Sequence, residues 1–311
     1  MPNHHPAAGD IYTRITNRII EDLEKGVRPW LKPWSAVKAA GHVARPLRHN
    51  GQPYSGINVV LLWSETIARG FASPIWMTFR QALALGGHVR KGETGSMVVY
   101  ANRIAKSAID ENGDEVEREI AFLKAYIVFC ADQIDGLPQQ YYPSIRAEPP
   151  ADTYAGRIER ADAFVAATGA NVHSGGNRAC YNPIADRIEM PAYTRFHDTG
   201  TSTAAEAYYA TLLHETVHWT APAHRCNCEL GKRFGDHAYA REELVAELGA
   251  AFLCADLGIT PEPRVDHAAY IGSWLTVLRN DKRAIISVAS FAQKAVDWLH
   301  VRTVGEPRSE A

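Results

Sequence analysis

Residues 201–219 contain neither proline nor glycine, and this stretch constrains the fold more than any other part of the chain. Within it, Leu213 and Val217 recur at the spacing of one buried helix face. His214 and His218 are then one turn apart on a common face, with Cβ atoms ~5–6 Å apart. The segment therefore predicts a helix that points two imidazoles in the same direction.

Two imidazoles placed in this way can bind one metal ion, because Zn²⁺ accepts histidine nitrogens at ~2.0–2.1 Å. Glu215 lies about 100° around the helix from His214, so it can reach a metal-coordinated water without being a ligand itself. That is the position of a general base. The spacing His-Glu-x-x-His therefore predicts a zinc hydrolase site. The alternative is a pair of partly exposed helix histidines.

A catalytic zinc takes three protein ligands, so a third ligand is expected downstream. One candidate is the pair Glu243 and Glu247, one turn apart on a helix predicted from about Ala238, whose apolar neighbours indicate burial. Buried carboxylates need a partner. The other candidate is His224, at the third histidine of the pattern H-E-x-x-H-x-x-G-x-x-H. Ala221 replaces the turn glycine of that pattern and disfavours a positive φ, so His224 ranks second.

The first arrangement resembles the gluzincin type, in which a glutamate on a second helix completes the site. The resemblance implies that Glu243 is the third ligand and that Glu247 fixes the tautomer of a ligand histidine. Glu242 is interpreted as a surface acid. A donor for developing oxyanion charge is expected at Tyr239 or His237. Cys226 and Cys228 form a C-x-C pair, which alone is a weak metal signal.

The net charge of −2 conceals two halves of opposite sign. Residues 1–105 hold 13 Lys and Arg against 6 Asp and Glu, a net +7, while residues 106–311 hold 20 against 29, a net −9. A basic first half predicts contact with a polyanion. Ordinary variation of the surface is the alternative explanation.

The segment "VRPWLKPW" alternates cations with aromatic rings, and its two prolines keep the backbone extended. Unpaired bases can stack on such rings while the cations contact phosphates. Single-stranded DNA is therefore the expected partner of the first half, through the residues Arg28, Trp30, Lys32, Trp34, Arg90 and Lys91. In the alternative interpretation, both tryptophans are core residues that clamp this segment onto the first helix.

Length and composition predict two domains of the α+β class. Residues 1–135 are expected to form an α+β domain that binds single-stranded DNA, with a hairpin around Asn112-Gly113. Residues 136–151 contain four prolines and are expected to be a linker. Residues 152–311 are expected to form a mostly helical domain with a small sheet around 179–192.

The chain is expected to be cytoplasmic. The first residues lack the basic start and apolar core of a secretory signal, and the apolar runs fall short of the ~20 residues of a membrane span. The five cysteines are an odd number without repeated spacing, which favours reduced thiols.

Taken together, the sequence resembles the ArdC-like plasmid antirestriction proteins. In the first half the likeness rests on "IYTRITNRIIEDLEKGVRPWLKPW", "PYSGINVVLLW" and "WMTFRQALALGGHVRKGETGSMVVY". In the second half it rests on "YNPIADRIEMP", "YYATLLHETVHWT" and "FGDHAYAREELVAELGAAFL". Family members commonly continue "HWTG", whereas this chain reads "HWTAPAHR".

The resemblance implies a single-stranded-DNA-binding domain joined to a zincin-like metallopeptidase domain. It implies a role in plasmid conjugation in bacteria, where the protein would shield incoming DNA from restriction. A restriction-system protein is the expected target of the peptidase. Zn²⁺ is the expected ion, and another divalent ion such as Mn²⁺ is an alternative. A second hypothesis is a non-proteolytic DNA-binding protein with a structural or regulatory metal site. A metal-dependent nuclease agrees poorly with His-Glu-x-x-His.

Overall fold

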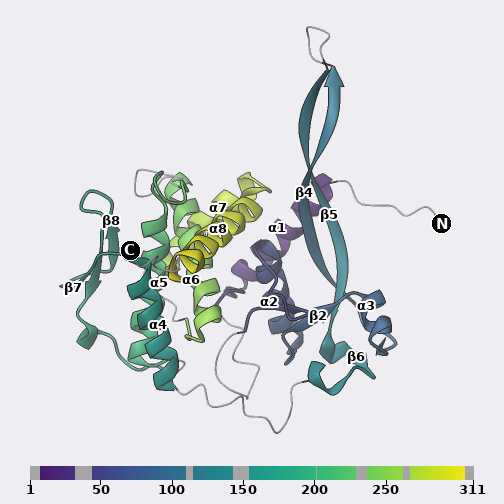
Figure 1. Cartoon of the computed structure of the whole chain (residues 1–311), viewed down its shortest axis with the longest axis horizontal. Coiled ribbons are helices and arrows are strands. Elements are labelled where there is room, and N and C mark those ends of the chain that lie inside the picture. Colours follow the sequence, from purple (N-terminus) through teal and green to yellow (C-terminus); the bar gives the residue numbers. More distant parts are fainter. Residues whose placement is uncertain are drawn as a thin grey trace, which may run out of the picture.

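The computed structural model describes residues 8–31, 44–109, 115–142, 154–200, 202–228, 237–261 and 267–304. Figure 1 shows a helical body with small sheets, from which a long two-stranded ribbon projects. The α+β class expected from the sequence is confirmed. Among the described helices, none is long and apolar enough to cross a bilayer.

The α-helices are α1 (Ala8–Glu24), α2 (Ile57–Arg69), α3 (Phe79–Ala84), α4 (Tyr154–Thr168), α5 (Ala204–Thr220), α6 (His237–Leu257), α7 (His267–Asn280) and α8 (Ala284–Val304). The strands are β1 (Leu47–Arg48), β2 (Ile75–Met77), β3 (His88–Val89), β4 (Ser96–Ile109), β5 (Glu115–Cys130), β6 (Ile134–Asp135), β7 (Val172–Gly176), β8 (Cys180–Asn182) and β9 (Arg187–Pro191). Short 3₁₀ turns are η1 (Ala131–Gln133), η2 (Gln139–Tyr141) and η3 (Tyr193–Arg195).

The first half combines helices with a four-stranded sheet in the order β1-β2-β5-β4. Strands β4 and β5 pair antiparallel from Ser96↔Val128 to Ile109↔Glu115, which confirms the hairpin expected around Asn112-Gly113. Residues 110–114 themselves lie outside the described part. Helix α2 ends at Arg69, and the expected Gly70 caps it with a left-handed φ of 67°.

The second half is built on helices α4 to α8 and a three-stranded sheet in the order β7-β9-β8. Strands β8 and β9 pair antiparallel, with Cys180 opposite Glu189, as the two short strands expected from the sequence. Strand β7 adds a parallel partner to β9, in the register Val172↔Ile188.

The two halves share one hydrophobic interior. Ile15 and Trp63 from the first half belong to the same buried cluster as Phe252 and Leu299 from the second half. Their interface also holds an ion pair, in which Nε of the buried Arg45 lies 2.8 Å from an Asp256 carboxylate oxygen. The chain therefore consists of two regions that pack as one body.

Part of the expected linker is also packed. Leu137 and Tyr141 are buried in a smaller cluster together with Met77 and Ile134. The remainder of the expected linker, residues 143–151, lies outside the described residues. The boundary at 136–151 stays a prediction.

Helices α5 and α6 approach each other closely because α6 has a glycine at the crossing. A Cβ placed on Gly249 would lie 2.9 Å from both Cγ atoms of Val217. Valine has a stiff side chain, so this contact leaves little room for adjustment. Val217 lies between His214 and His218 on α5, so Gly249 sets the distance from α6 to the two histidines.

We predict that Gly249→Ala destabilises the protein, because overpacking costs roughly 1–3 kcal/mol. The higher helix propensity of alanine offsets up to about 1 kcal/mol of this cost. Thermal denaturation measures the change. Gly272→Ala in α7 is the matched control, because a Cβ at Gly272 meets no atom within 4 Å. Gly272→Ala should stabilise, by about 0.4–1 kcal/mol. Equal behaviour of the two variants would contradict the role of Gly249 as a spacer.

Candidate metal centre

Helix α5 is fixed at its start by reciprocal hydrogen bonds. The Thr203 hydroxyl accepts from the Glu206 backbone N–H, and the Glu206 carboxylate accepts from the Thr203 backbone N–H. From this start the helix runs unbroken through His214, Glu215 and His218. The Nε2 atoms of the two histidines are 3.2 Å apart, so the expected convergence of the imidazoles is observed.

Helix α6 brings the carboxylate of Glu243 to the same point. One Glu243 oxygen lies 3.5 Å from His214 Nε2, and the other lies 3.6 Å from His218 Nε2. Four ligands at ~2.0–2.1 Å around a tetrahedral ion are about 3.3–3.4 Å from one another. The two imidazole nitrogens, and the Glu243 oxygen nearest to each of them, have separations of 3.2 to 3.6 Å, close to this value. The three residues therefore fit a divalent ion that is bound by two imidazoles and one carboxylate.

The Glu243 carboxyl is prepared for this role by its surroundings. Burial raises its pKa, but hydrogen bonds from His214 and His218, together with their charges, outweigh burial and hold that pKa well below its usual range. The carboxyl is therefore ionised, as a ligand must be. Burial, and then hydrogen bonding to Tyr270 and Glu243, raises the pKa of the Tyr239 hydroxyl. Tyr239 therefore stays protonated beside the third ligand.

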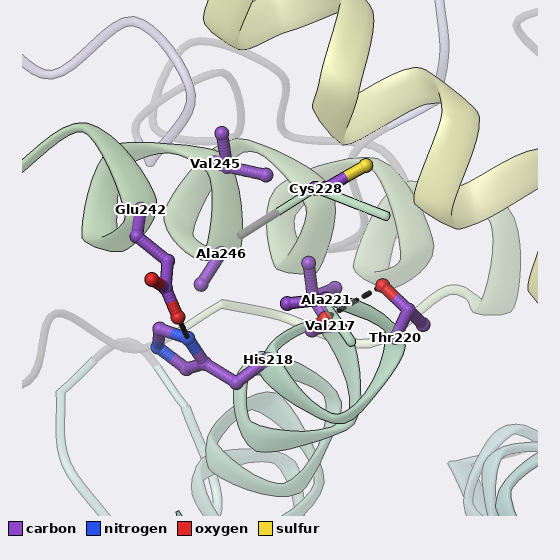
Figure 2. Close-up of a pocket in the computed structure, with 8 residues that line it drawn as sticks. All are labelled: Val217, His218, Thr220, Ala221, Cys228, Glu242, Val245 and Ala246. Carbon is purple, nitrogen blue, oxygen red and sulfur yellow. Dashed lines mark hydrogen bonds and ion pairs between the residues drawn. The ribbon is translucent and has the colours of Figure 1, made fainter. Parts of the chain in front are cut away.

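Glu242 is not the surface acid expected from the sequence. Its Oε1 lies 3.4 Å from His218 Nδ1, and its side chain is only 19% exposed. Figure 2 shows Glu242 on α6 meeting the His218 ring from α5. Two adjacent acids in the sequence, Glu242 and Glu243, could have indicated that more than one carboxylate lies near the histidines. The rotation of α6 against α5 decides that both of them face His218.

The acids around His218 control its protonation in the absence of metal. Burial alone would lower the pKa of His218, but hydrogen bonds to Glu242 and Glu243 and the nearby negative charges outweigh burial and raise this pKa to about 10. A metal ion binds only the neutral imidazole. Metal binding therefore displaces a proton, and metal affinity should increase as the pH rises toward this pKa.

Glu215 is held by the neighbouring sheet. Its Oε2 accepts a hydrogen bond of 2.9 Å from the backbone N–H of Tyr181 in β8. The residue is 3% exposed and follows His214 directly on α5. This contact from β8 was not foreseen from the sequence, because it joins residues from separate elements. The hydrogen bond fixes the orientation of the carboxylate beside the ligands.

Glu247 lies one turn after Glu243 and faces the opposite side of the His214 ring. Its Oε2 is 3.8 Å from His214 Nδ1, whereas Glu243 faces His214 Nε2. The resemblance to the gluzincin arrangement had implied that Glu247 lies behind a ligand histidine. The two acids on α6 therefore bracket one imidazole.

His224 lies outside this cluster. It is exposed and lines a surface hollow with Asp186, Arg225 and Trp298. Helix α5 is followed by Ala221 in a right-handed conformation with a φ of −62°, so the chain does not make the glycine turn that would return His224 to the ligands. All five cysteines are free thiols, and the Cys226 backbone oxygen accepts from Lys294 Nζ at 2.6 Å.

Those residues expected to contact DNA that the structure describes are not brought together as one surface. Trp30 is 0% exposed and packs against Trp274, with ring centroids 6.1 Å apart. This corrects the stacking prediction for Trp30: its ring is a core residue here and offers no face to a base. Arg28 beside it is half-buried.

The other cations of that prediction are spread over the first half. Arg90 is exposed, but its guanidinium pairs with Glu93 at 2.8 Å and with Asp135 at 3.4 Å. These two carboxylates weaken the attraction of Arg90 for a phosphate. Lys91 is exposed. Lys32 and Trp34 lie outside the described residues.

Comparison with known proteins agrees with this geometry. Residues 159–291 match the family model of a zincin-like metallopeptidase, and residues 9–129 match the N-terminal domain of anti-restriction factor ArdC. A metal-free crystal structure of the antirestriction protein ArdC from plasmid R388 superposes with a TM-score of 0.77 at 44% identity, covering 96% of this chain and 100% of that chain. The chain belongs to the ArdC family of antirestriction proteins.

Other relatives extend the comparison. The Mn(II)-bound structure of the R388 protein gives a TM-score of 0.76 at 42% identity, over 97% of this chain and 100% of that one, and supports a divalent metal. The uncharacterized protein y4eC of Sinorhizobium fredii is 41% identical over 97% of this chain and 95% of its own length. DNA primase TraC of Escherichia coli is 37% identical over 93% of this chain, which spans only 27% of that protein.

We predict that this ArdC-family chain binds about one divalent ion and that Glu243→Ala loses more metal than His224→Ala. Glu243 supplies one of three converging ligands, so its loss should exceed the roughly 10- to 100-fold effect of changing an outer partner. Competition with a chromophoric chelator measures both affinities. Greater loss in His224→Ala would contradict the assignment of the third ligand.

Proposed function

We propose that this antirestriction protein acts in plasmid conjugation as a metal-dependent peptidase that also binds single-stranded DNA. The main support for peptidase activity is the convergence of His214, His218 and Glu243, with Glu215 next to His214. A purely structural metal site has no need of a carboxylate beside its ligands. The zincin-like family match supports the same reaction class.

In this proposal His214, His218 and Glu243 hold the ion, and Glu215 is the general base. A divalent ion bound there lowers the pKa of a coordinated water and polarises a carbonyl oxygen. The Tyr181 backbone N–H donates to Glu215 Oε2 and orients the carboxylate, which is the group that we propose accepts the proton of the attacking water. Tyr239 keeps its hydroxyl proton, and we propose it as the donor that stabilises the developing oxyanion.

We propose Zn²⁺ as the working ion and Mn²⁺ as the alternative. Two imidazoles and one carboxylate are the ligand set of many catalytic zinc sites. The R388 relative has a Mn(II)-bound crystal structure, which supports the alternative. Measuring peptidase activity with each ion added to the metal-free protein separates the two.

The peptidase target that we propose is a protein of the restriction system, met in the cytoplasm of the cell that receives the plasmid. Such a target would explain why an antirestriction protein carries a zincin-like domain. The similarity to TraC, a DNA primase, supports a setting in which the protein meets single-stranded DNA.

The DNA surface that we propose lies on the β4–β5 ribbon. Tyr100 and Tyr126 are 51% and 40% exposed, and Lys124 Nζ lies 5.2 Å from the centroid of the Tyr126 ring. Tyr100 is opposite Lys124, and Tyr126 follows two residues later on the same face. Two exposed rings and a cation on a projecting ribbon (Figure 1) suit a single strand whose bases are unpaired.

We predict that Glu215→Gln retains the metal and the fold but loses proteolysis, because Gln cannot accept the proton. The expected loss is at least about 100-fold, as for removal of a general base. Incubation with candidate restriction subunits, with and without chelator and single-stranded DNA, measures cleavage. Cleavage at the wild-type rate by Glu215→Gln would contradict the role of Glu215.

We predict that Tyr126→Ala weakens binding of single strands by roughly 1–3 kcal/mol and leaves the salt dependence unchanged, because stacking is not ionic. Lys124→Ala should instead reduce the slope of affinity against salt. Tyr193→Ala, which removes a tyrosine of 49% exposure in the second half, is the control. Equal affinity for duplex and single strands, or normal binding by Tyr126→Ala, would exclude this surface.

The second candidate function is a DNA-binding protein whose metal site is structural or regulatory and which protects DNA by occupying it. The burial of the centre favours this candidate, because His214, Glu215 and Glu243 are each less than a tenth exposed. Antirestriction that survives Glu215→Gln would favour it over the peptidase.

A further inference from the structure

Trp30 belongs to the first half of the chain but contacts Glu247, the carboxylate behind the candidate metal centre. Its indole Nε1 donates to Glu247 Oε1 at 3.2 Å, and the residue is 0% exposed. The other oxygen of the same carboxylate, Glu247 Oε2, faces His214 Nδ1 at 3.8 Å. A contact path therefore runs from Trp30 through Glu247 to a candidate metal ligand.

We propose that Trp30 is a positioning residue for the metal centre, through which the first half of the chain sets the metal affinity of the second half. The inference rests on the proposed site at His214, His218 and Glu243. It assigns to Trp30 a function other than DNA contact or simple packing.

The physical basis is the rigid plane of a carboxylate. When Trp30 fixes Oε1 of Glu247, the direction of Oε2 is fixed as well, and Oε2 is the atom that faces the His214 ring. Partners of this kind orient a ligand histidine and select its tautomer. An indole N–H can only donate, so Trp30 always presents a donor to the acid.

The surroundings of Trp30 hold its ring in place. Trp274 of α7 packs edge-to-face against it, at a centroid distance of 6.1 Å and an interplanar angle of 65°. Glu247 is 4% exposed, and a buried carboxylate depends on its donors because water cannot replace them. Loss of the indole N–H should therefore change the orientation of Glu247.

The test uses Trp30→Phe in the full chain, which keeps an aromatic ring but removes the N–H. Trp63→Phe is the matched control. Trp63 is 2% exposed, packs on Phe252 of α6 at 5.9 Å and donates its indole N–H to the Ala44 backbone oxygen at 3.2 Å. Both variants lose the indole N–H of a buried tryptophan whose ring packs against the second half, but only Trp30 donates to Glu247.

Zn²⁺ affinity is measured by chelator competition under conditions in which thermal melting shows that each variant is folded. Trp30→Phe should bind Zn²⁺ about 10-fold more weakly, at the low end of the effects of outer partners, and Trp63→Phe should bind as the wild type does. In a Glu247→Gln background, Trp30→Phe should have a much smaller effect. Equal affinity of Trp30→Phe and the wild type, or equal losses in both tryptophan variants, would overturn the proposal.

A measurement on the wild type covers the case in which Trp30→Phe does not fold. In nitrogen-15 spectra, one indole N–H resonance should be displaced by Glu247→Gln, and that resonance should also move when Zn²⁺ is added to the wild type. An unmoved resonance would overturn the role of Trp30. Absence of Zn²⁺ binding by the wild type would instead refute the proposed metal site itself.

Discussion

The close packing of α5 against α6 is the constraint on which the rest of the second half depends. Gly249 leaves room for Val217, and the approach that follows brings Glu243 to His214 and His218. A ligand set for one ion requires its atoms within a few ångströms of each other, and the packing of α6 on α5 places these three side chains at that distance. The metal chemistry is thus a consequence of backbone proximity.

This proximity concentrates negative charge in the interior, which needs partners. Glu242 and Glu243 contact the histidines, the Tyr181 backbone donates to Glu215, and the Trp30 indole donates to Glu247. Glu242 and Glu243 both contact His218 of α5, whereas Glu215 and Glu247 accept from donors in other parts of the chain. The acids therefore lie close together but are oriented by different sets of neighbours.

Local patterns in the sequence predicted the elements that depend on local physics. The absence of proline and glycine before Trp219 predicted α5, Gly70 marked the end of α2, and Asn112-Gly113 marked the hairpin. The His-Glu-x-x-His spacing predicted the convergence of two imidazoles, because i and i+4 positions always share a helix face. The i, i+4 spacing and apolar neighbours of Glu243 and Glu247 made them candidates, and the resemblance to the gluzincin arrangement gave them their expected roles.

Contacts between distant residues were not predictable in the same way. Trp30 and Glu247 are 217 positions apart, and the alternation of rings and cations around Trp30 was equally compatible with a DNA surface. Glu242 was misassigned because its exposure depends on the rotation of α6 against α5, which no local pattern records. The shared interior also depends on tertiary packing, whereas the length of the chain and its proline-rich segment had predicted two domains joined by a linker.

The shared interior has a consequence for the order in which the chain can fold during synthesis. The Gln293 side chain of α8 accepts hydrogen bonds from Arg45 and from the backbone N–H of Gly56, which precedes α2. These first-half residues therefore contact one of the last helices of the chain. These first-half residues emerge from the ribosome long before α8 is made. The apolar surface that the first half buries against the second half therefore stays exposed while the zincin-like half is being translated. A nascent chain of this architecture thus depends on rapid completion, or on a chaperone, to protect its N-terminal half.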